Sequence, residues 1–205
     1  MTDLSKKTIE YYNQNAVTFY EGTVNADMSY VMSKFCAYLE EMAAGKEPIK
    51  VIDAGCGSGR DIKAFIERGY SVRAFDASSE MARMAGELSG IEVECRTFSD
   101  VNEICEYDGV WACASLLHVP REELEGSIMK LRDALKENGV LYMSFKCGDS
   151  ERTKDGRFFC DMTEEQVVDI LNRLKMKPLE IFITGDVREG RGDERWINVI
   201  AGKKN

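Results

Sequence analysis

Glycines alternate with small residues in one short segment, Asp53-Ala54-Gly55-Cys56-Gly57-Ser58-Gly59, which continues an apolar run that starts at Lys50. Asp61 follows two residues after the last of these glycines. Glycine lets the backbone turn sharply and lets a ligand approach the main chain. The N–H groups at the start of a helix are free to bind a ligand. The segment therefore predicts a ligand-binding turn between a strand and a helix.

The glycine spacing narrows the kind of ligand. A dinucleotide fingerprint, G-x-G-x-x-G, would need a third glycine where Arg60 or Ile62 stands, and no Gly-Lys-Ser/Thr of a phosphate-binding loop follows. Asp61 also places a negative charge where a pyrophosphate would lie. We therefore expect a ligand without phosphates and with a positive centre. An NAD-dependent oxidoreductase is an alternative that this spacing weakens.

Two further acidic segments follow later predicted strands. Asp76 ends the second strand, 17 residues beyond Gly59, where a carboxylate can accept hydrogen bonds from both hydroxyls of a ribose. An alternative for Asp76 is a cap on the next helix. Thr97-Phe98-Ser99-Asp100 follows the third strand, so that Asp100 could accept from an adenine amino group and Phe98 could lie beside the ring. Asp100 could equally be a solvated loop residue.

These segments together resemble the class I S-adenosylmethionine-dependent methyltransferases. Val51 to Asp61 resembles motif I of that family, and Asp76 matches its ribose-binding acid. Phe98 to Asp100 resembles the adenine-contacting segment, Asp108 to Val119 the fourth-strand motif at the methionine end, and Leu135 to Phe145 the segment leading into the fifth strand. The resemblance covers roughly residues 45 to 150 and the closing strand pair. Small bacterial members, tellurite-resistance-like methyltransferases among them, look similar around Gly57 to Asp61.

The resemblance implies S-adenosyl-L-methionine as the cofactor and a set of residues that bind it. The implied cofactor-binding residues are Asp53, Gly55, Cys56, Gly57, Gly59, Asp61, Asp76, Ala77, Met81, Phe98, Ser99, Asp100 and Ala114. Cys56 could instead be a small apolar filler of the loop.

The elements that must position these residues alternate along the chain. The first 45 or so residues are predicted to be helical, and strands are predicted at residues 50–54, 71–76, 91–96, 109–114 and 140–145, with helices between them. The helix after Pro120 is predicted to carry an apolar stripe through Leu135 and to end at Gly139. A capping-box pattern, Thr163 with Gln166, begins another helix. Two final strands, 179–184 and 196–201, have no helix between them and should pair antiparallel.

This order predicts an α/β fold of the Rossmann-like, doubly wound kind. We expect a seven-stranded, mainly parallel sheet with an antiparallel C-terminal strand pair and an N-terminal helical cap. We further expect one methyltransferase domain over residues 1–205. Within it, 1–45 would form the cap, 46–150 the cofactor-binding core, and 151–205 the substrate-side segment with the closing strands.

The candidate catalytic residues are His118, Tyr12 and Tyr20. His118, the one histidine, follows the fourth strand and could be a general base, a substrate ligand or a packing residue. Tyr12 and Tyr20 could close over the methionine part of the cofactor or belong to the core of a helix. Five late arginines could border the pocket or be solvated: Arg152, Arg157, Arg188, Arg191 and Arg195. Convergence of two or more of them would favour an anionic substrate.

Charge and cysteine content limit the partners. The net charge of -9 disfavours nucleic acid and anionic membranes. Seven cysteines without a C-x-x-C pair, with one histidine, argue against a zinc site and favour a reducing compartment. Residues 1–7 lack the apolar stretch of a signal peptide, and no apolar run reaches the ~18 residues of a membrane span. We expect a cytoplasmic monomer or homodimer without a bound metal.

The predicted function is methyl transfer from S-adenosylmethionine to a small-molecule acceptor by direct in-line displacement. An RNA or protein methyltransferase is the first alternative. A non-catalytic protein that binds S-adenosylmethionine is the second. The sequence leaves open the acceptor atom and the need for a general base.

Overall fold

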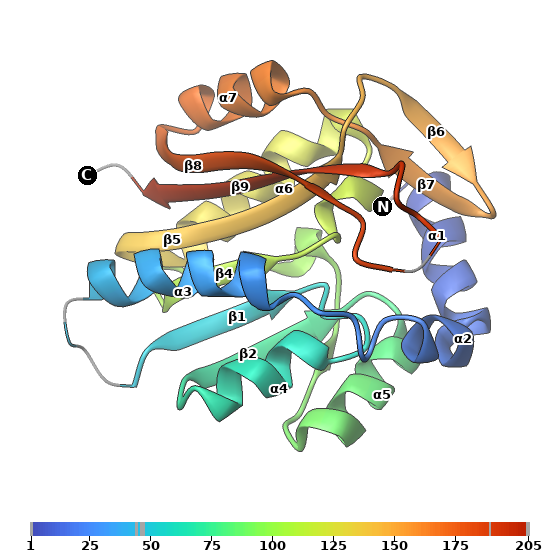
Figure 1. Ribbon diagram of the computed structural model, residues 1–205, viewed down its shortest axis with the longest axis horizontal. Helices are drawn as coiled ribbons and strands as arrows, with labels where there is room; N and C mark the ends of the chain where they lie inside the picture. The colour runs from blue at the N-terminus through green and yellow to red at the C-terminus, as the bar shows by residue number, and fades with distance from the viewer. Residues whose placement is uncertain (1, 44, 46–47, 189, 204–205) are drawn as a thin grey trace.

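A computed structural model describes residues 2–43, 45, 48–188 and 190–203. Its main sheet consists of β1 (Lys50–Ala54), β2 (Ser71–Asp76), β3 (Glu94–Cys95), β4 (Tyr107–Ala112), β5 (Leu135–Lys146), β8 (Met176–Gly185) and β9 (Arg195–Lys203). The strand order is β3-β2-β1-β4-β5-β9-β8, in which β1 to β5 pair parallel and β9 pairs antiparallel with both β5 and β8 (Figure 1). The predicted doubly wound, seven-stranded sheet with an antiparallel C-terminal pair is confirmed.

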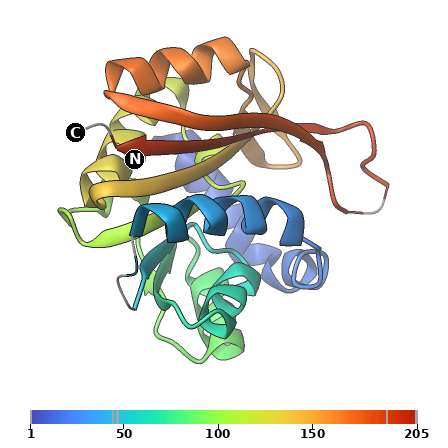
Figure 2. The ribbon, with the colours of Figure 1, turned by 60° about the vertical axis from the view of Figure 1, so that its left-hand side comes forward.

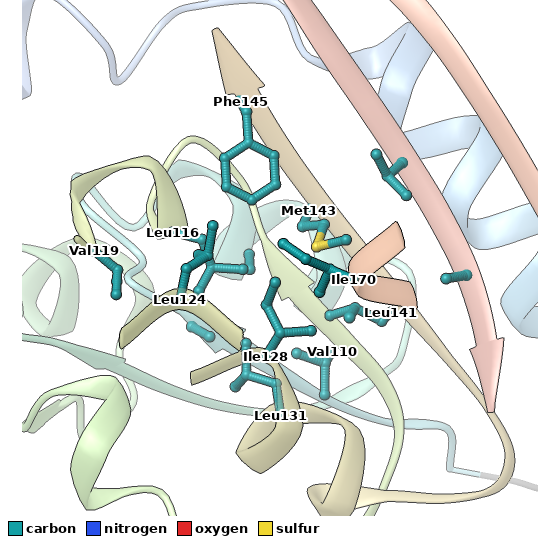
Figure 3. Close-up of a cluster of buried hydrophobic side chains, with 14 of the residues drawn as sticks. Val110, Leu116, Val119, Leu124, Ile128, Leu131, Leu141, Met143, Phe145 and Ile170 are labelled. Atoms are coloured by element: carbon teal, nitrogen blue, oxygen red, sulfur yellow. The ribbon is translucent and has the colours of Figure 1, made fainter. Parts of the chain in front are cut away.

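Helices cover both faces of this sheet. They are α1 (Asp3–Gln14), α2 (Ala16–Glu21), α3 (Ser29–Ala43), α4 (Arg60–Glu67), α5 (Ser79–Ser89), α6 (Arg121–Ala134) and α7 (Glu164–Arg173). Side chains of a strand point alternately to its two faces. Trp111 and Tyr142 accordingly pack with α3 and α4, whereas Val110 and Leu141 pack with α6 and α7. Figure 3 shows the second of these clusters between α6 and the sheet.

Local sequence signals account for several helix ends. The Thr163 hydroxyl oxygen accepts from the Gln166 N–H, and the Gln166 side-chain oxygen accepts from the Thr163 N–H, which is the predicted capping box at the start of α7. The predicted helical N-terminus is also present as α1, α2 and α3. Figure 1 shows α1 and α2 beside the carboxyl ends of the parallel strands. The N-terminal helices therefore lie at the edge where doubly wound sheets bind ligands.

Three predicted boundaries were wrong. The third strand is Glu94–Cys95, because β3 is an edge strand that pairs with β2 at only two positions. The fourth strand is Tyr107–Ala112, two residues earlier than predicted, and the chain turns at Ala114 with a positive φ. Leu135 begins β5 rather than ending α6, and Gly139 lies within that strand. Leu135 is fully buried, and an apolar residue at that position suits a helix or a strand equally.

A two-stranded hairpin of β6 (Glu151–Lys154) and β7 (Arg157–Cys160) was not predicted. Its turn is Asp155-Gly156, with φ values of +50° and +79°. An Asp-Gly pair at positive φ is a common two-residue hairpin turn, so the dipeptide was a usable sequence signal. The hairpin places β7 next to α1, as Figure 1 shows.

The β8–β9 connection lies at the same edge of the sheet as the ligand-binding turn. β8 and β5 both pair antiparallel with β9, so β8 runs parallel to β5 and its carboxyl end reaches that edge. Figure 2 shows this hairpin extending outward from the sheet. The carboxyl edge is thus bordered by α1, by β7 and by the β8–β9 connection.

Candidate functional site

A cavity of about 560 Å³ opens at the carboxyl edge of the sheet. Its walls come from the turns after β1, β2 and β4, from α1, from β7 and from the β8–β9 connection. Pockets for ligands of cofactor size occupy roughly 300–1,000 Å³. The strand order reverses between β1 and β4, so the cavity lies at the topological switch point of the sheet.

The segment from Gly55 to Gly59, called the glycine loop below, contributes to the wall of this cavity. Gly55 has a φ of +80°, and a Cβ there would lie 2.5 Å from the Cβ of Ser115. Gly57 lines the cavity with a φ of +53°. Gly59 lies outside the lining; its φ is +79°, and a Cβ there would lie 2.8 Å from the Cα of Ala85 on α5. Gly59 therefore serves helix packing, while the other two leave main chain open to a ligand.

Two buried carboxylates flank the loop and differ in their partners. Asp61 accepts from Arg60 at 2.7 and 2.8 Å and from the Trp111 indole N–H at 2.9 Å. Burial alone would lower the pKa of Arg60, but the Asp61 carboxylate raises it. Asp53 is 2% exposed and lines the cavity, and its Oδ2 has no hydrogen-bond partner among the described residues. Burial, and then the nearby Asp61, raise the pKa of Asp53 well above its usual value.

Asp76 connects the end of β2 to the glycine loop. Its Oδ2 accepts from the Gly57 N–H and its Oδ1 from the Ser78 N–H, each at 2.9 Å. Burial raises the pKa of Asp76. Each carboxylate oxygen has a second lone pair, and Asp76, Ala77 and Met81 all line the cavity.

The segment after β3 divides into two parts. Phe98 and Ser99 line the cavity, and the Phe98 ring packs edge-on against Phe75 with centroids 5.6 Å apart. Asp100 does not line the cavity and is exposed. Its carboxylate accepts from the N–H and the hydroxyl of Thr97 at 2.9 and 2.7 Å, which closes the capping box of the short 3₁₀ helix Phe98–Asp100. The expected adenine contact of Asp100 therefore has no support in this geometry.

The turn after β4 forms the middle of the cavity. Ala114 lines it with a φ of +50°, a backbone conformation that costs energy for a residue with a Cβ. Its N–H donates to the hydroxyl of Ser144 on β5 at 2.8 Å, and Ser115 donates to the Ala54 carbonyl at 2.7 Å. These bonds to neighbouring strands hold the turn in its strained shape.

His118 and Tyr12 both line the cavity and meet there, although 106 residues separate them along the chain. The Nδ1 of His118 lies 2.6 Å from the Phe158 carbonyl, which can only accept, so Nδ1 carries the proton. The Nε2 lone pair then accepts from the Tyr12 hydroxyl at 2.8 Å. Burial lowers the pKa of His118 to about 4 and raises the pKa of Tyr12 to about 12. Both side chains are therefore neutral near pH 7.

Tyr20 and Cys56, two further residues singled out from the sequence, differ in their position relative to the cavity. Tyr20, the third catalytic candidate, is half-buried on α2 and does not line the cavity. Cys56 does line it, and burial raises the pKa of its thiol well above the usual value. Cys56 is thus a neutral wall of the cofactor end and not a thiolate.

Basic residues line the cavity near the Tyr12–His118 pair. Arg157, Arg188 and Arg191 line the cavity, as does Lys146 at the end of β5, which the sequence did not single out. Two of the five late arginines do not line it: Arg152 pairs with Asp161 at 2.7 Å, and Arg195 is exposed. Three of the five late arginines therefore converge on the cavity, and of these Arg188 bonds both oxygens of Asp186 at 2.9 and 2.5 Å.

Among the described residues, no helix combines the length and the apolar character that a membrane span requires. Across residues 2–43, 45, 48–188 and 190–203, no group of three or more His, Cys, Asp or Glu side chains is placed to hold a metal ion.

Comparison with known proteins supports one class of protein. Residues 51–139 match the model of a methyltransferase domain. An uncharacterized methyltransferase of Staphylococcus carnosus is 27% identical over 138 residues, which cover 66% of this chain and 66% of that protein. A ubiquinone biosynthesis O-methyltransferase of Actinobacillus pleuropneumoniae is 24% identical over 156 residues, 70% of this chain and 66% of that protein.

The fold is also that of solved methyltransferases. The Burkholderia thailandensis 1,6-didemethyltoxoflavin-N1-methyltransferase, crystallised with 1,6-didemethyltoxoflavin and S-adenosylhomocysteine, superposes with a TM-score of 0.70 at 19% identity. The match covers 100% of this chain and 92% of that one. The comparisons therefore show a methyltransferase domain within residues 51–139 and the fold of solved S-adenosylmethionine-dependent methyltransferases, and the chain spans about two thirds or less of the length of the curated relatives it matches.

Proposed function

We propose that this protein transfers the methyl group of S-adenosylmethionine to a small-molecule acceptor by direct in-line displacement. One observation carries the proposal. A single cavity is lined both by the glycine loop with Asp76 and by the Tyr12–His118 pair. The first group suits the cofactor of this class, and the second offers polar groups to an acceptor.

The residues of the first group fit that cofactor. Asp53 offers a buried oxygen without a partner among the described residues, which suits the ammonium group of the methionine part. Asp76 offers two carboxylate oxygens to the ribose hydroxyls, and Phe98 an aromatic surface to the adenine. Eight further lining residues complete the proposed cofactor site: Gly55, Cys56, Gly57, Asp61, Ala77, Met81, Ser99 and Ala114.

The chain's own part in the reaction is mainly positioning. When bound, S-adenosylmethionine supplies an electrophilic methyl group on a positively charged sulfur. α1 covers the cavity, since Thr8 accepts from the Phe158 N–H at 3.0 Å and Asn13 accepts from Ser78 at 2.6 Å. Such closure excludes water and holds an acceptor in line with the methyl group.

Tyr12 and His118 are the proposed proton-handling groups. Because the Tyr12 hydroxyl donates to His118, its oxygen acts as a hydrogen-bond acceptor on its other side, where Arg157 lies close and where we place an acceptor O–H or N–H. A proton released by the acceptor would pass to the Tyr12 oxygen, and the Tyr12 proton would pass to Nε2 of His118.

The acceptor class has support from both charge and relatives. The Burkholderia neighbour binds 1,6-didemethyltoxoflavin, a small molecule, together with S-adenosylhomocysteine. The net charge of -9 disfavours nucleic acid as a partner. The proposal includes one domain over residues 1–205, with the cap 1–45, the core 46–150 and the substrate-side segment 151–205. It also includes a monomer or homodimer in the cytoplasm.

Two measurements test this function. Calorimetry should show micromolar or tighter binding of S-adenosylhomocysteine and none of NAD; the reverse result would reject the cofactor. A panel of small metabolites with methyl-labelled S-adenosylmethionine should then yield a labelled small product. Label that appears only in added RNA or protein would instead support the first alternative, and cofactor binding without any acceptor would support the non-catalytic one.

A further inference from the structure

We propose that the acceptor carries a carboxylate, or an anionic group of similar shape, which Arg157 binds in the part of the cavity next to Tyr12. The inference rests on the function proposed above and names the acceptor's chemistry. It follows from the burial of Arg157, from the lack of a close carboxylate beside it in the described part of the chain, and from its neighbours.

Arg157 is buried without an adequate counter-charge. The residue is 9% exposed, and its Nε has no hydrogen-bond partner among the described residues. Its ion pair is with Asp155, 3.8 Å from one Nη, and that carboxylate is 65% exposed and therefore screened by solvent. A buried cation that lacks good partners is costly. A ligand anion would supply the counter-charge that the buried guanidinium lacks.

Other arginines of this region show what a satisfied guanidinium looks like. Arg60 bonds both oxygens of Asp61 at 2.7 and 2.8 Å. Arg152 bonds both oxygens of Asp161 at 2.7 and 3.1 Å. Arg157 has no comparable pair in the described part of the chain. Its planar donor array is thus available for a bidentate bond to a carboxylate or phosphate.

Aromatic rings hold the Arg157 guanidinium in place. Its central carbon lies 4.7 Å from the ring centroid of Tyr11 on α1 and 5.3 Å from that of Phe159 on β7. These contacts fix the direction of the side chain without using its N–H donors. A pre-positioned donor array loses little conformational entropy when it binds an anion.

A second cation reinforces the same wall. Lys146 is 9% exposed and lines the cavity, with its ammonium 5.8 Å from the Phe159 ring. It pairs with Glu194, and burial lowers its pKa to about 8. Burial is the largest cause of the lowered pKa of His118, and the bond to the Phe158 carbonyl opposes it. The positive charges of Arg157 and Lys146 lower this pKa further. Both cations are therefore close to the proposed proton-handling pair.

A carboxylate in this cavity could also come from the methionine part of the cofactor. The place of Arg157 on β7, beside the proposed proton-handling pair of Tyr12 and His118, favours the acceptor as the source. The experiment below distinguishes the two sources by measuring cofactor and anion binding separately.

The test uses Arg157→Gln, Arg157→Lys and a matched control, Arg173→Gln, which removes an exposed arginine paired with Glu125. Calorimetry first measures S-adenosylhomocysteine binding to each protein. The S-adenosylhomocysteine complexes are then titrated with acetate, benzoate and phenylacetate, each against its neutral amide. Circular dichroism confirms that each variant is folded.

We expect at least one carboxylate to bind the wild-type complex tenfold or more tightly than its amide. Arg157→Gln should remove that preference, Arg157→Lys should keep part of it, and the control should keep all of it, with cofactor affinity unchanged throughout. Equal binding of every acid and amide, or a preference that survives Arg157→Gln, would overturn the proposal. So would a tenfold loss of cofactor affinity in Arg157→Gln, which would assign the arginine to the cofactor. Failure of the wild type to bind S-adenosylhomocysteine would reject the proposed function itself.

Discussion

Replacing Asp76 with alanine should weaken cofactor binding about a hundredfold. The carboxylate holds the glycine loop through the Gly57 N–H and keeps a lone pair on each oxygen for a ribose hydroxyl. A hydrogen bond to a charged group is worth about 1.5–3 kcal/mol. Loss of two such bonds, partly offset by water that enters the space, leaves about 3 kcal/mol. At roughly 1.4 kcal/mol per tenfold change, that is about two orders of magnitude in Kd.

Calorimetry with S-adenosylhomocysteine measures this change directly. Glu87→Ala is the matched control, because it removes a carboxylate of the same charge from an exposed position on α5, where it pairs with Arg83. The control should bind within twofold of the wild type. Urea denaturation of Asp76→Ala checks that the glycine loop still folds. A folded Asp76→Ala protein with wild-type affinity would refute the ribose role and leave Asp76 as an anchor of the loop.

Three further predictions concern stability, each measured by urea denaturation. Gly55→Ala should lower the free energy of unfolding by at least about 2 kcal/mol more than Gly69→Ala does. Both glycines have φ near +80°, but an added Cβ would meet a side chain at 2.5 Å at Gly55 and nothing within 4 Å at Gly69. Equal losses would contradict the steric argument. His118 has its pKa lowered to about 4, so the unfolded chain binds more protons than the folded one below about pH 6.5, and stability falls as the pH falls. The histidine should cost the wild type about 2 kcal/mol between pH 7 and pH 5, a loss absent from His118→Gln; parallel pH profiles would count against a buried neutral imidazole. Trp111→Phe removes the indole donor to buried Asp61 and should cost about 1–3 kcal/mol, and an unchanged midpoint would show that Arg60 alone satisfies that carboxylate.

Short-range patterns were enough to predict most of the sheet. Alternation of apolar strands and amphipathic helices placed β1, β2, β8 and β9 to within a few residues. The glycine loop and the Thr163 capping box were also visible, because each depends on residues within a few positions of one another. These features are local, so a sequence pattern can specify them.

Boundaries that depend on a neighbouring strand were the ones that the pattern missed. Leu135 pairs with Tyr107 and so belongs to β5, although its spacing continues the apolar stripe of α6. β3 is two residues long because it pairs with β2 at only two positions. The β6–β7 hairpin was overlooked despite Asp155-Gly156, because its flanking residues are polar and charged as well as apolar.

The sequence could group the residues of the glycine loop, whereas it could not bring Tyr12 and His118 together. Asp53, Gly55 and Gly57 lie within five residues of each other, so one motif contains them, and all three line the cavity. Tyr12 and His118 come together only because α1 packs against β7 and the turn after β4 reaches the same edge.

The glycine loop and its strand by themselves determined the class of fold and the kind of cofactor, since backbone conformation at glycine is a local property. Tertiary structure decided which side chains share the cavity. It used Gly59 for helix packing against α5 and brought buried Arg157 beside Tyr12. Burial and long-range contacts set these roles, and neither is encoded in the spacing of residues along the chain.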